Sequence, residues 1–341
     1  MSDRKINVCV YTGSLNLIDK SGVGKAIEHQ IAILKKANVS VNEVPLKECD
    51  FIHINFILPD SVLTALRAKR LGVKVLFYGH STMEDFKNSF VGSNFFAPAF
   101  KRWIKFCYNL GDIIVTPTEY SKRILEGYGF KKEIYALSNG IDTDYWKKDC
   151  SSPAASKEEF LKKYNIENGR KIIMSVGHFM LRKGIDDYIS LAKNHPDKTF
   201  IWFGQTNRLF VPSKIRRMIR KAPDNLIFAG YVNSDDLRQA YECCDLFLFL
   251  SREETEGIVV LEALSCEIPI VIRDIPVYNE WLSDRSNVYK FRDINKLSDE
   301  LSNLLETDSS EITHNGRRTA EKKNFTAIGK DLTEIYKKML D

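Results

Sequence analysis

Short apolar runs alternate with amphipathic stretches from one end of the chain to the other. The runs have the length of strands, and the stretches between them repeat apolar residues at the spacing of a helix. This alternation is typical of parallel sheets with helices on both faces, so the sequence predicts an α/β fold. Strands are expected at residues 6–11, 39–44, 51–54, 73–78, 113–116 and 134–137 in the first half. In the second half they are expected at residues 171–176, 199–203, 225–228, 246–250 and 268–272.

The two series of strands predict two domains. They are separated by residues 147–156, a polar stretch with one proline that is typical of a linker. A chain of 341 residues is long enough for two cores of ordinary size. We expect one domain at residues 1–150 and another at residues 157–324, followed by a helix at residues 325–341. Open α/β sheets bind ligands beyond the carboxyl ends of their strands, which places the expected site in a cleft between the domains.

The composition, 44% hydrophobic and 28% charged, is that of a globular protein. No apolar run approaches the ~20 residues that cross a bilayer, and the first residues lack a signal-peptide core. The seven cysteines show no paired metal spacing, so we expect a reduced, cytoplasmic protein. The net charge is +5, and its excess lies within residues 1–165, which favours an anionic partner for the first domain.

The segment from Glu254 to Glu262 carries the most specific chemistry. Two carboxylates stand eight positions apart, with Gly257 and an apolar run between them. The segment follows an expected strand and leads into a helix, so Gly257, Ile258 and Val259 would expose backbone N–H groups at the helix start. A diphosphate could bind these groups while one carboxylate holds sugar hydroxyls and the other holds ribose. An acidic loop with helix-favouring glutamates gives the same pattern.

This pattern resembles the signature of retaining family-4 glycosyltransferases, whose two Rossmann-like domains face each other in the fold called GT-B. The resemblance implies that Glu254 holds the transferred sugar and Glu262 the ribose of a nucleotide-sugar donor. It also implies that the last helix returns to pack on the N-terminal domain. The family usually has an aromatic residue just before the glycine, whereas this chain has Glu256, which we also expect near the donor.

A glycine-rich loop precedes the first expected helix and contains Gly13, Gly22 and Gly24. Glycines at such a place allow a ligand to approach the backbone closely. A P-loop and a dinucleotide fingerprint are both excluded, because positions 19, 26 and 27 lack the residues that these motifs require. The family places a comparable loop against the donor diphosphate, so we expect Gly22 and Gly24 to contact the donor. A plain helix cap would explain the same residues.

Adjacent cations follow the first strand of the second domain. Arg182 and Lys183 lie where this strand leaves the sheet, a place that suits the growing charge of a leaving diphosphate. The family commonly has Gly-Arg at the start and Lys-Gly at the end of this segment. Lys183 and Gly184 match, whereas His178 stands at the arginine position. Whether Arg182 takes over the second cationic role stays open, and a solvated turn would also explain the pair.

The fourth expected strand leads to His80, where catalytic groups of α/β folds tend to lie. Family-4 enzymes often carry a histidine here, so the resemblance places His80 beside the transferring sugar. The residues that follow it, as far as Phe86, resemble those of bacterial glycolipid synthases. Glu84 or Asp85 could be an acceptor-side base, although the helix dipole equally explains acidic residues at a helix start. A loop histidine with satisfied hydrogen bonds would account for His80 as well.

Residues 95–107 combine aromatic and basic side chains at helical spacing. The apolar face would carry Phe96, Phe100, Trp103, Ile104 and Cys107, and the basic face Lys101, Arg102 and Lys105. This pattern fits an interfacial helix, and equally a buried helix whose lysines reach water. A second basic run at residues 216–221 could touch anionic head groups. No nucleic-acid motif accompanies either run, so we expect an anionic membrane surface as the partner and no nucleic acid.

Together these features predict a retaining hexosyltransferase that uses a UDP-hexose at the inner face of the cell membrane. The expected acceptor is a membrane glycolipid such as monoglucosyl-diacylglycerol. No metal-ligand spacing occurs, so we expect no metal and assign the neutralisation of the diphosphate to backbone amides and cations. In this family the acceptor is generally held to attack from the front face within an ion pair, so we name no protein nucleophile.

Other functions fit parts of the same pattern. The acceptor could be soluble or a polysaccharide. A nucleotide-sugar epimerase shares the fold, and a non-catalytic partner subunit would bind nucleotide without transferring a sugar. An NAD-dependent enzyme is disfavoured because the glycine fingerprint fails.

Overall fold

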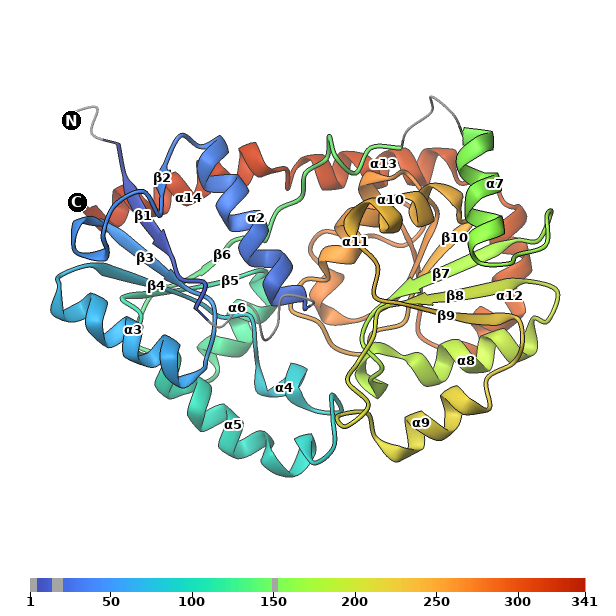
Figure 1. The fold of residues 1–341 in the computed structure, drawn as a ribbon, viewed down its shortest axis with the longest axis horizontal. Coiled ribbons are helices and arrows are strands. Elements are labelled where there is room, and N and C mark those ends of the chain that lie inside the picture. The colour runs from blue at the N-terminus through green and yellow to red at the C-terminus, as the bar shows by residue number, and fades with distance from the viewer. Residues whose placement is uncertain (1–4, 14–20, 149–152, 341) are drawn as a thin grey trace.

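The computed structural model describes residues 5–13, 21–148 and 153–340, and within these ranges the chain forms two six-stranded sheets. The sheets lie side by side along the long axis of the molecule, and helices cover their faces (Figure 1). The predicted α/β fold is therefore confirmed. In spatial order the first sheet contains β2 (Ser40–Val41), β1 (Asn7–Val10), β3 (Phe51–Ile54), β4 (Lys74–Tyr78), β5 (Ile113–Thr116) and β6 (Ile134–Ala136). The second contains β12 (Tyr289–Phe291), β11 (Ile270–Arg273), β10 (Leu246–Phe249), β7 (Ile172–Val176), β8 (Thr199–Phe203) and β9 (Leu226–Gly230).

All neighbouring strands in both sheets run parallel, as the continuous apolar runs predict for strands buried on both faces. Every expected strand is present, although β2 is shorter than the predicted run and pairs with β1 alone. The prediction missed β12, which is only three residues long and contains Lys290. Such a segment has no clear apolar signal of its own, and its pairing with β11 makes it a strand.

The helices pack on both faces of each sheet, over four apolar clusters, two to a sheet. In the first half they are α2 (Gly22–Lys36), α3 (Pro59–Arg70), α4 (Met83–Phe86), α5 (Ser93–Tyr108) and α6 (Glu119–Glu126). In the second half they are α7 (Pro153–Lys163), α8 (Ile185–Asn194), α9 (Ser213–Arg220), α10 (Ser234–Cys243), α11 (Ile258–Ser265), α12 (Ile294–Glu306), α13 (Ser310–Glu321) and α14 (Phe325–Leu340).

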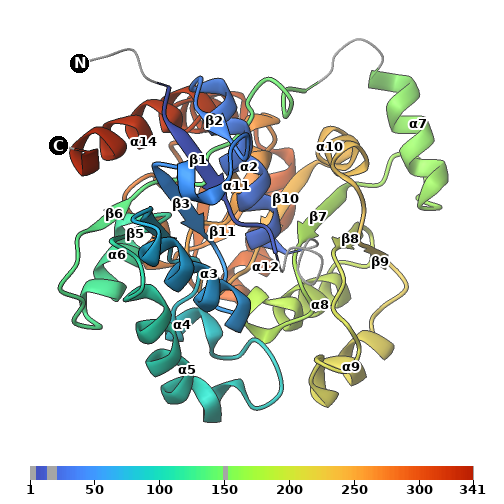
Figure 2. The same ribbon diagram turned by 60° about the vertical axis from the view of Figure 1, so that its left-hand side comes forward.

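The last helix, α14, packs on the first sheet and not on the second. It lies against α2 and shares an apolar cluster with β1 and β3, beside the N-terminal strands in the turned view (Figure 2). Tyr336 stacks on Phe51 with ring centres 4.5 Å apart, and its hydroxyl lies 2.6 Å from Nε2 of His53. The chain therefore runs from the first sheet to the second and back again.

The two passages between the sheets lie next to each other. The outward passage follows β6, and the return passage joins α13 to α14. The N–H of Ile141 donates to the carbonyl of Lys323 at 3.0 Å, and Ile141 forms an isolated parallel bridge with Asn324. The predicted linker at residues 147–156 lies partly outside the described residues, and its last part belongs to α7. The domain limits of 1–150 and 157–324 stay a prediction.

Candidate active site

A cavity of about 490 Å³ lies between the two sheets, where residues of both halves meet. The first half contributes residues that follow β1, β4 and β6, and the second half contributes residues that follow β7, β8, β9 and β10. These are the carboxyl ends of parallel strands, where open α/β sheets bind ligands. The predicted residues in its lining are Gly22, His80, Arg182, Lys183, Glu254, Gly257, Ile258, Val259 and Glu262. Gly24 and Glu256 are absent from the lining.

Helix α11 points its amino end at the cavity. Gly257 caps this helix in the left-handed region, with φ of +87°. A Cβ at this position would lie 3.0 Å from the hydroxyl of Tyr278, so the turn favours glycine for both conformation and space. The first helical residues, Ile258 and Val259, belong to the turn whose N–H groups have no partner within a helix. The helix start can therefore bind an anion such as a diphosphate.

Glu262 lies inside the same helix and is only 3% exposed. Its Oε2 accepts a hydrogen bond from the hydroxyl of Tyr241 at 3.2 Å. Burial raises the pKa of Glu262 to about 7, and the opposing effects of Lys25 and Tyr241 do not cancel it. Near neutral pH this carboxyl therefore exists in both protonation states.

Glu254 and Lys183 form an ion pair inside the cavity, and the ammonium of Lys183 lies 5.5 Å from the ring centre of Phe249. Burial alone would raise the pKa of Glu254, but Lys183 and Arg182 outweigh it and hold this pKa below its ordinary value. Burial lowers the pKa of Lys183, partly offset by Glu254. The carboxylate at the end of β10 is thus kept ionised beside a cation.

Arg182 also borders the cavity, but its guanidinium bonds across the cleft to the first half of the chain. Nη1 lies 2.7 Å from Oδ1 of Asp85, and Nε donates to Oγ of Ser89 at 3.0 Å. Nη1 also donates to the carbonyl of Glu253 at 2.9 Å. Burial raises the pKa of Asp85 despite its contact with Arg182. These bonds favour a bridging role for Arg182, and its predicted role as a second cation for the diphosphate stays a prediction.

His178, at the arginine position of the family motif, has an imidazole whose Nδ1 lies 2.8 Å from the carbonyl of Gln205. Because a carbonyl can only accept, Nδ1 carries the proton in this contact. Burial, together with Lys183 and Arg182, lowers the pKa of His178. The side chain is therefore neutral at pH 7 in this structure.

His80 lies in a buried polar chain that the sequence did not reveal. Its Nε2 lies 2.7 Å from Oδ1 of Asn55, which also accepts from Nε2 of Gln30 at 2.7 Å. Burial lowers the pKa of His80 to about 4, so the imidazole is neutral and donates through Nε2. Asn55 directly follows the expected strand at residues 51–54, and this position at a strand end was the signal that could have found it.

The prediction that Glu256 contacts the donor disagrees with its position. The residue is fully buried, and its carboxylate accepts from Ser138 and Asn139 and faces Lys323. All three partners lie on the passages between the two sheets. A charged side chain in this place needs several hydrogen-bond donors, and the two passages supply them. The aromatic residue that the family usually has at this position would need none.

The glycine loop is described in part, because residues 14–20 lie outside the described ranges. Gly22 is the first residue of α2 and lines the cavity. Gly24 is buried in that helix, and its N–H donates to Oγ of the capping Ser21 at 3.2 Å. For Gly24 the alternative of a plain helix cap agrees with the structure, and its predicted contact with the donor stays a prediction.

Sequence comparison places these features in a known family. The chain is 34% identical to a processive diacylglycerol alpha-glucosyltransferase of Acholeplasma laidlawii over 336 residues. The aligned residues cover 98% of this chain and 99% of that protein. Residues 156–323 match the model of glycosyl transferases group 1, and residues 32–145 match that of glycosyltransferase family 4. The chain is a family-4 glycosyltransferase.

Other relatives of this glycosyltransferase agree with that assignment. An alpha-galactosylglucosyldiacylglycerol synthase of Streptococcus pneumoniae is 27% identical over 287 residues, which cover 82% of this chain and 75% of that protein. A sucrose-phosphate synthase of Thermosynechococcus elongatus has the same fold, with a TM-score of 0.78, 15% identity and 99% of each chain covered. A structure of Anabaena HepE in complex with UDP-glucose gives a TM-score of 0.75 at 15% identity, over 98% of this chain and 100% of that one. The predicted GT-B fold is confirmed.

Helix α5 of this glycosyltransferase is buried on one side and exposed on another, and its predicted place at a membrane interface stays a prediction. Ile104 and Cys107 are buried in the first domain, whereas Phe96 and Trp103 are 56% and 38% exposed. Phe95, which the predicted face did not include, is 82% exposed. One side of α5 thus packs on the core and another presents aromatic rings to the surroundings. None of the described helices is long and apolar enough to cross a membrane.

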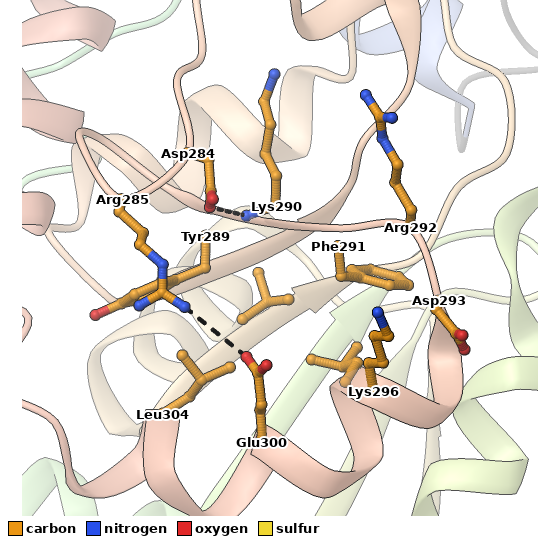
Figure 3. Close-up of a pocket in the computed structure, with 12 residues that line it drawn as sticks. Asp284, Arg285, Tyr289, Lys290, Phe291, Arg292, Asp293, Lys296, Glu300 and Leu304 are labelled. Atoms are coloured by element: carbon orange, nitrogen blue, oxygen red, sulfur yellow. Dashed lines mark hydrogen bonds and ion pairs between the residues drawn. The ribbon is translucent and has the colours of Figure 1, made fainter.

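A second pocket of this glycosyltransferase lies away from the cleft, between β12 and α12 (Figure 3). Arg285 is turned toward Glu300, with 3.9 Å between nitrogen and oxygen (Figure 3). Arg292 and Lys290 pair with Asp274. Acidic groups thus face these cations, which leaves little net attraction for an anion. Among the described residues there is also no group of three histidine, cysteine or acidic side chains placed to hold a metal ion.

Proposed function

We propose that this glycosyltransferase moves a hexose from a UDP-hexose to a membrane glycolipid such as monoglucosyl-diacylglycerol, with retention at the anomeric carbon. The observation that carries the proposal is the amino end of α11, flanked by the ionised Glu254–Lys183 pair and by Glu262 in a cavity shared by both sheets. The names of two relatives, a diacylglycerol glucosyltransferase and a galactosylglucosyldiacylglycerol synthase, support the choice of acceptor.

Each side of the donor has a proposed partner. The backbone N–H groups of Gly257, Ile258 and Val259 bind the diphosphate, and Lys183 adds a positive charge beside it. Glu254 accepts hydrogen bonds from the hexose hydroxyls, because its lowered pKa keeps the carboxylate ionised. Glu262 accepts from the ribose hydroxyls when it is ionised.

The chemical step requires charge to build up on the diphosphate as the bond from the anomeric carbon to its oxygen breaks. The helix start and Lys183 stabilise that charge in a site partly closed to water. The acceptor hydroxyl forms the new bond to the anomeric carbon on the face that the diphosphate leaves, and its proton passes to a diphosphate oxygen. No protein nucleophile takes part, and the neutral His80 contributes hydrogen bonding and not charge.

The acceptor side of the proposal rests on the first domain, whose helix α5 carries the exposed rings of Phe95, Phe96 and Trp103. Aromatic rings next to Arg102 and Lys105 suit the interface of an anionic membrane. In this position the protein would be peripheral on the inner face of the cell membrane, with its cleft open to glycolipid.

The test is UDP release from UDP-glucose and UDP-galactose, with and without glycolipid acceptor, by the intact protein and by Glu254→Gln. The substitution keeps the shape and removes the charge, so transfer should fall at least 100-fold, equivalent to about 3 kcal/mol of transition-state stabilisation. Glu306→Gln, at a side chain that is 74% exposed, is the control and should keep full activity.

Three outcomes would contradict the proposal. Near-normal transfer by Glu254→Gln would reject the role of that carboxylate. A changed sugar nucleotide in the absence of acceptor would identify an epimerase. Nucleotide binding without any transfer would identify a non-catalytic partner subunit.

A further inference from the structure

The loop at residues 253–257, between β10 and α11, faces the donor cavity on one side and the first domain on the other. Glu254 and Gly257 line the cavity. Thr255 lines the cavity as well, and it bonds to the first domain together with Glu253 and Glu256. Oε1 of Glu253 accepts from the hydroxyl of Tyr120 at 2.8 Å, and the carbonyl of Thr255 accepts from Oγ1 of Thr118 at 2.9 Å.

Glu256 makes the strongest of these attachments. Its Oε2 accepts from the backbone N–H of Asn139 at 2.9 Å and from Nδ2 of the same residue at 2.8 Å. Its Oε1 accepts from Oγ of Ser138 at 2.5 Å and lies 3.2 Å from Nζ of Lys323. Ser138 and Asn139 follow β6 on the outward passage, and Lys323 precedes α14 on the return passage. One carboxylate therefore joins the loop to both connections between the domains.

Burial makes the contacts of Glu256 with Ser138, Asn139 and Lys323, which form a joint between the loop and the passages, costly to break. Glu256 is 0% exposed, and a buried carboxylate that loses its donors is strongly destabilising because no water replaces them. The two passages cannot shift relative to the loop without leaving this charge without its donors. In enzymes with two domains, the hinge determines whether the groups of both domains meet at the substrate.

We propose that Glu256 is a positioning residue that fixes the first domain, with His80 and the acceptor, in register with the sugar-binding Glu254. The inference rests on the proposed transferase function and assigns Glu256 no contact with any substrate. Most of the proposed UDP contacts, those of α11, Lys183 and Glu262, belong to the second domain, so UDP binding should depend little on this joint. Sugar transfer needs groups of both domains, so its rate should depend on this joint.

The experiment compares Glu256→Gln with the intact protein in three measurements. The kcat of transfer should fall at least tenfold, while the Kd of UDP changes less than threefold. The radius of gyration from small-angle scattering should rise, because the domains are no longer held in one arrangement. Ser138→Ala removes one donor and should give a smaller fall of kcat, again without a change in the Kd of UDP.

The matched control is Glu280→Gln. It removes the ion pair between Arg123 and Glu280, which also joins the two halves of the chain but does not touch the loop. This variant should keep kcat within twofold and the radius of gyration unchanged. If it lowered kcat as far as Glu256→Gln does, any interdomain contact would suffice and the assignment to Glu256 would fall.

The results separate this inference from the function on which it rests. A kcat within twofold for Glu256→Gln would overturn the inference, and so would a parallel loss of UDP binding, which indicates local damage to the donor site. If Glu256→Gln does not fold, the same two criteria apply to Ser138→Ala. If the intact protein transfers no sugar, the proposed function fails, and the radius of gyration then decides the inference alone.

Discussion

Glu254 and Glu262 are both buried carboxylates of the donor cavity, but their pKa values shift in opposite directions. Lys183 and Arg182 overcome the effect of burial at Glu254, whereas Lys25 and Tyr241 do not overcome it at Glu262. Two glutamates of one cavity therefore differ in ionisation, because different charged and polar groups lie within a few ångströms of each. One is a permanent acceptor for sugar hydroxyls, and the other can exchange a proton with solvent when ligand binds.

We predict that the affinity for UDP-glucose increases with pH around neutrality. Because burial raises the pKa of Glu262 to about 7, the carboxyl is protonated below that pH and must lose its proton to accept from both ribose hydroxyls. The Kd should rise as pH falls from 8 to 6, by up to about tenfold per unit. Calorimetric titration with UDP-glucose measures this, because its diphosphate lacks the terminal phosphate group that titrates near pH 6.

The control for this prediction is Glu262→Gln, whose side chain does not titrate. Its Kd should be weaker than that of the intact protein at pH 8 and should lose most of the pH dependence. A pH profile that keeps the same slope in this variant would assign the proton to another group, of which Glu253 is the first candidate because burial raises its pKa to about 7 as well.

At the scale of elements, α14 completes the first domain although it is the last helix of the chain. It supplies apolar residues to the cluster around β1 and β3. Tyr336 also supplies a hydroxyl to His53, whose Nδ1 is buried without a hydrogen-bond partner among the described residues. Burial lowers the pKa of His53 to about 3, so this imidazole is neutral and depends on Tyr336 for its one hydrogen bond.

We predict that Tyr336→Phe lowers the free energy of unfolding by about 1–3 kcal/mol, because both nitrogens of His53 are then buried without a partner. Chemical denaturation measures the change, and hydrogen exchange should locate the loss of protection in α14 and the first sheet. Lys337→Gln, on an exposed face of the same helix, is the control and should change stability by less than 0.5 kcal/mol in either direction, within the ordinary range of about ±0.5 for surface substitutions. Equal stability of Tyr336→Phe and the intact protein would show that water reaches His53.

At the scale of the whole molecule, exposed apolar side chains gather in segments from both domains. Helix α5 carries Phe95 and Phe106, and the segment before α9 carries Leu209 and Phe210 at 81% and 61% exposure. Both helices lie at the lower edge of the molecule in Figures 1 and 2. Helix α9 also carries three of the cations of the predicted basic run. A membrane surface can bury these rings while its head groups pair with the cations.

We predict that the protein co-sediments with vesicles, and more strongly as their anionic lipid content rises. Phe95→Ser combined with Phe106→Ser should weaken this binding about 10–100-fold, since each ring contributes about 1.5–3 kcal/mol when fully buried and these are only partly inserted. Leu340→Ser changes an exposed apolar residue of α14, which lies along the upper edge of the molecule in Figure 1, and this variant should bind as the intact protein does. Equal binding at all lipid compositions, or by all three proteins, would remove the membrane from the proposal.

The sequence by itself determined the fold class, the family and part of the cavity lining. Its strands are buried on both faces, so each is a continuous apolar run that the sequence shows. The prediction missed β12 because an edge strand of three residues has no such run. Glu254, Gly257 and Glu262 could be found because they lie close together in the chain, in a spacing set by one loop and one helix.

Only the tertiary structure decided which of the charged residues face the cavity. Glu256 belongs to the same short segment, yet its partners come from positions 138, 139 and 323. Asn55 likewise reaches His80 from the end of the neighbouring strand. Such contacts join residues that are distant in the chain, and the ionisation of each group depends on the burial that these contacts create. The local spacing of residues in the sequence reveals neither these contacts nor the ionisation of each group, because both arise when the two sheets and the returning helix pack together.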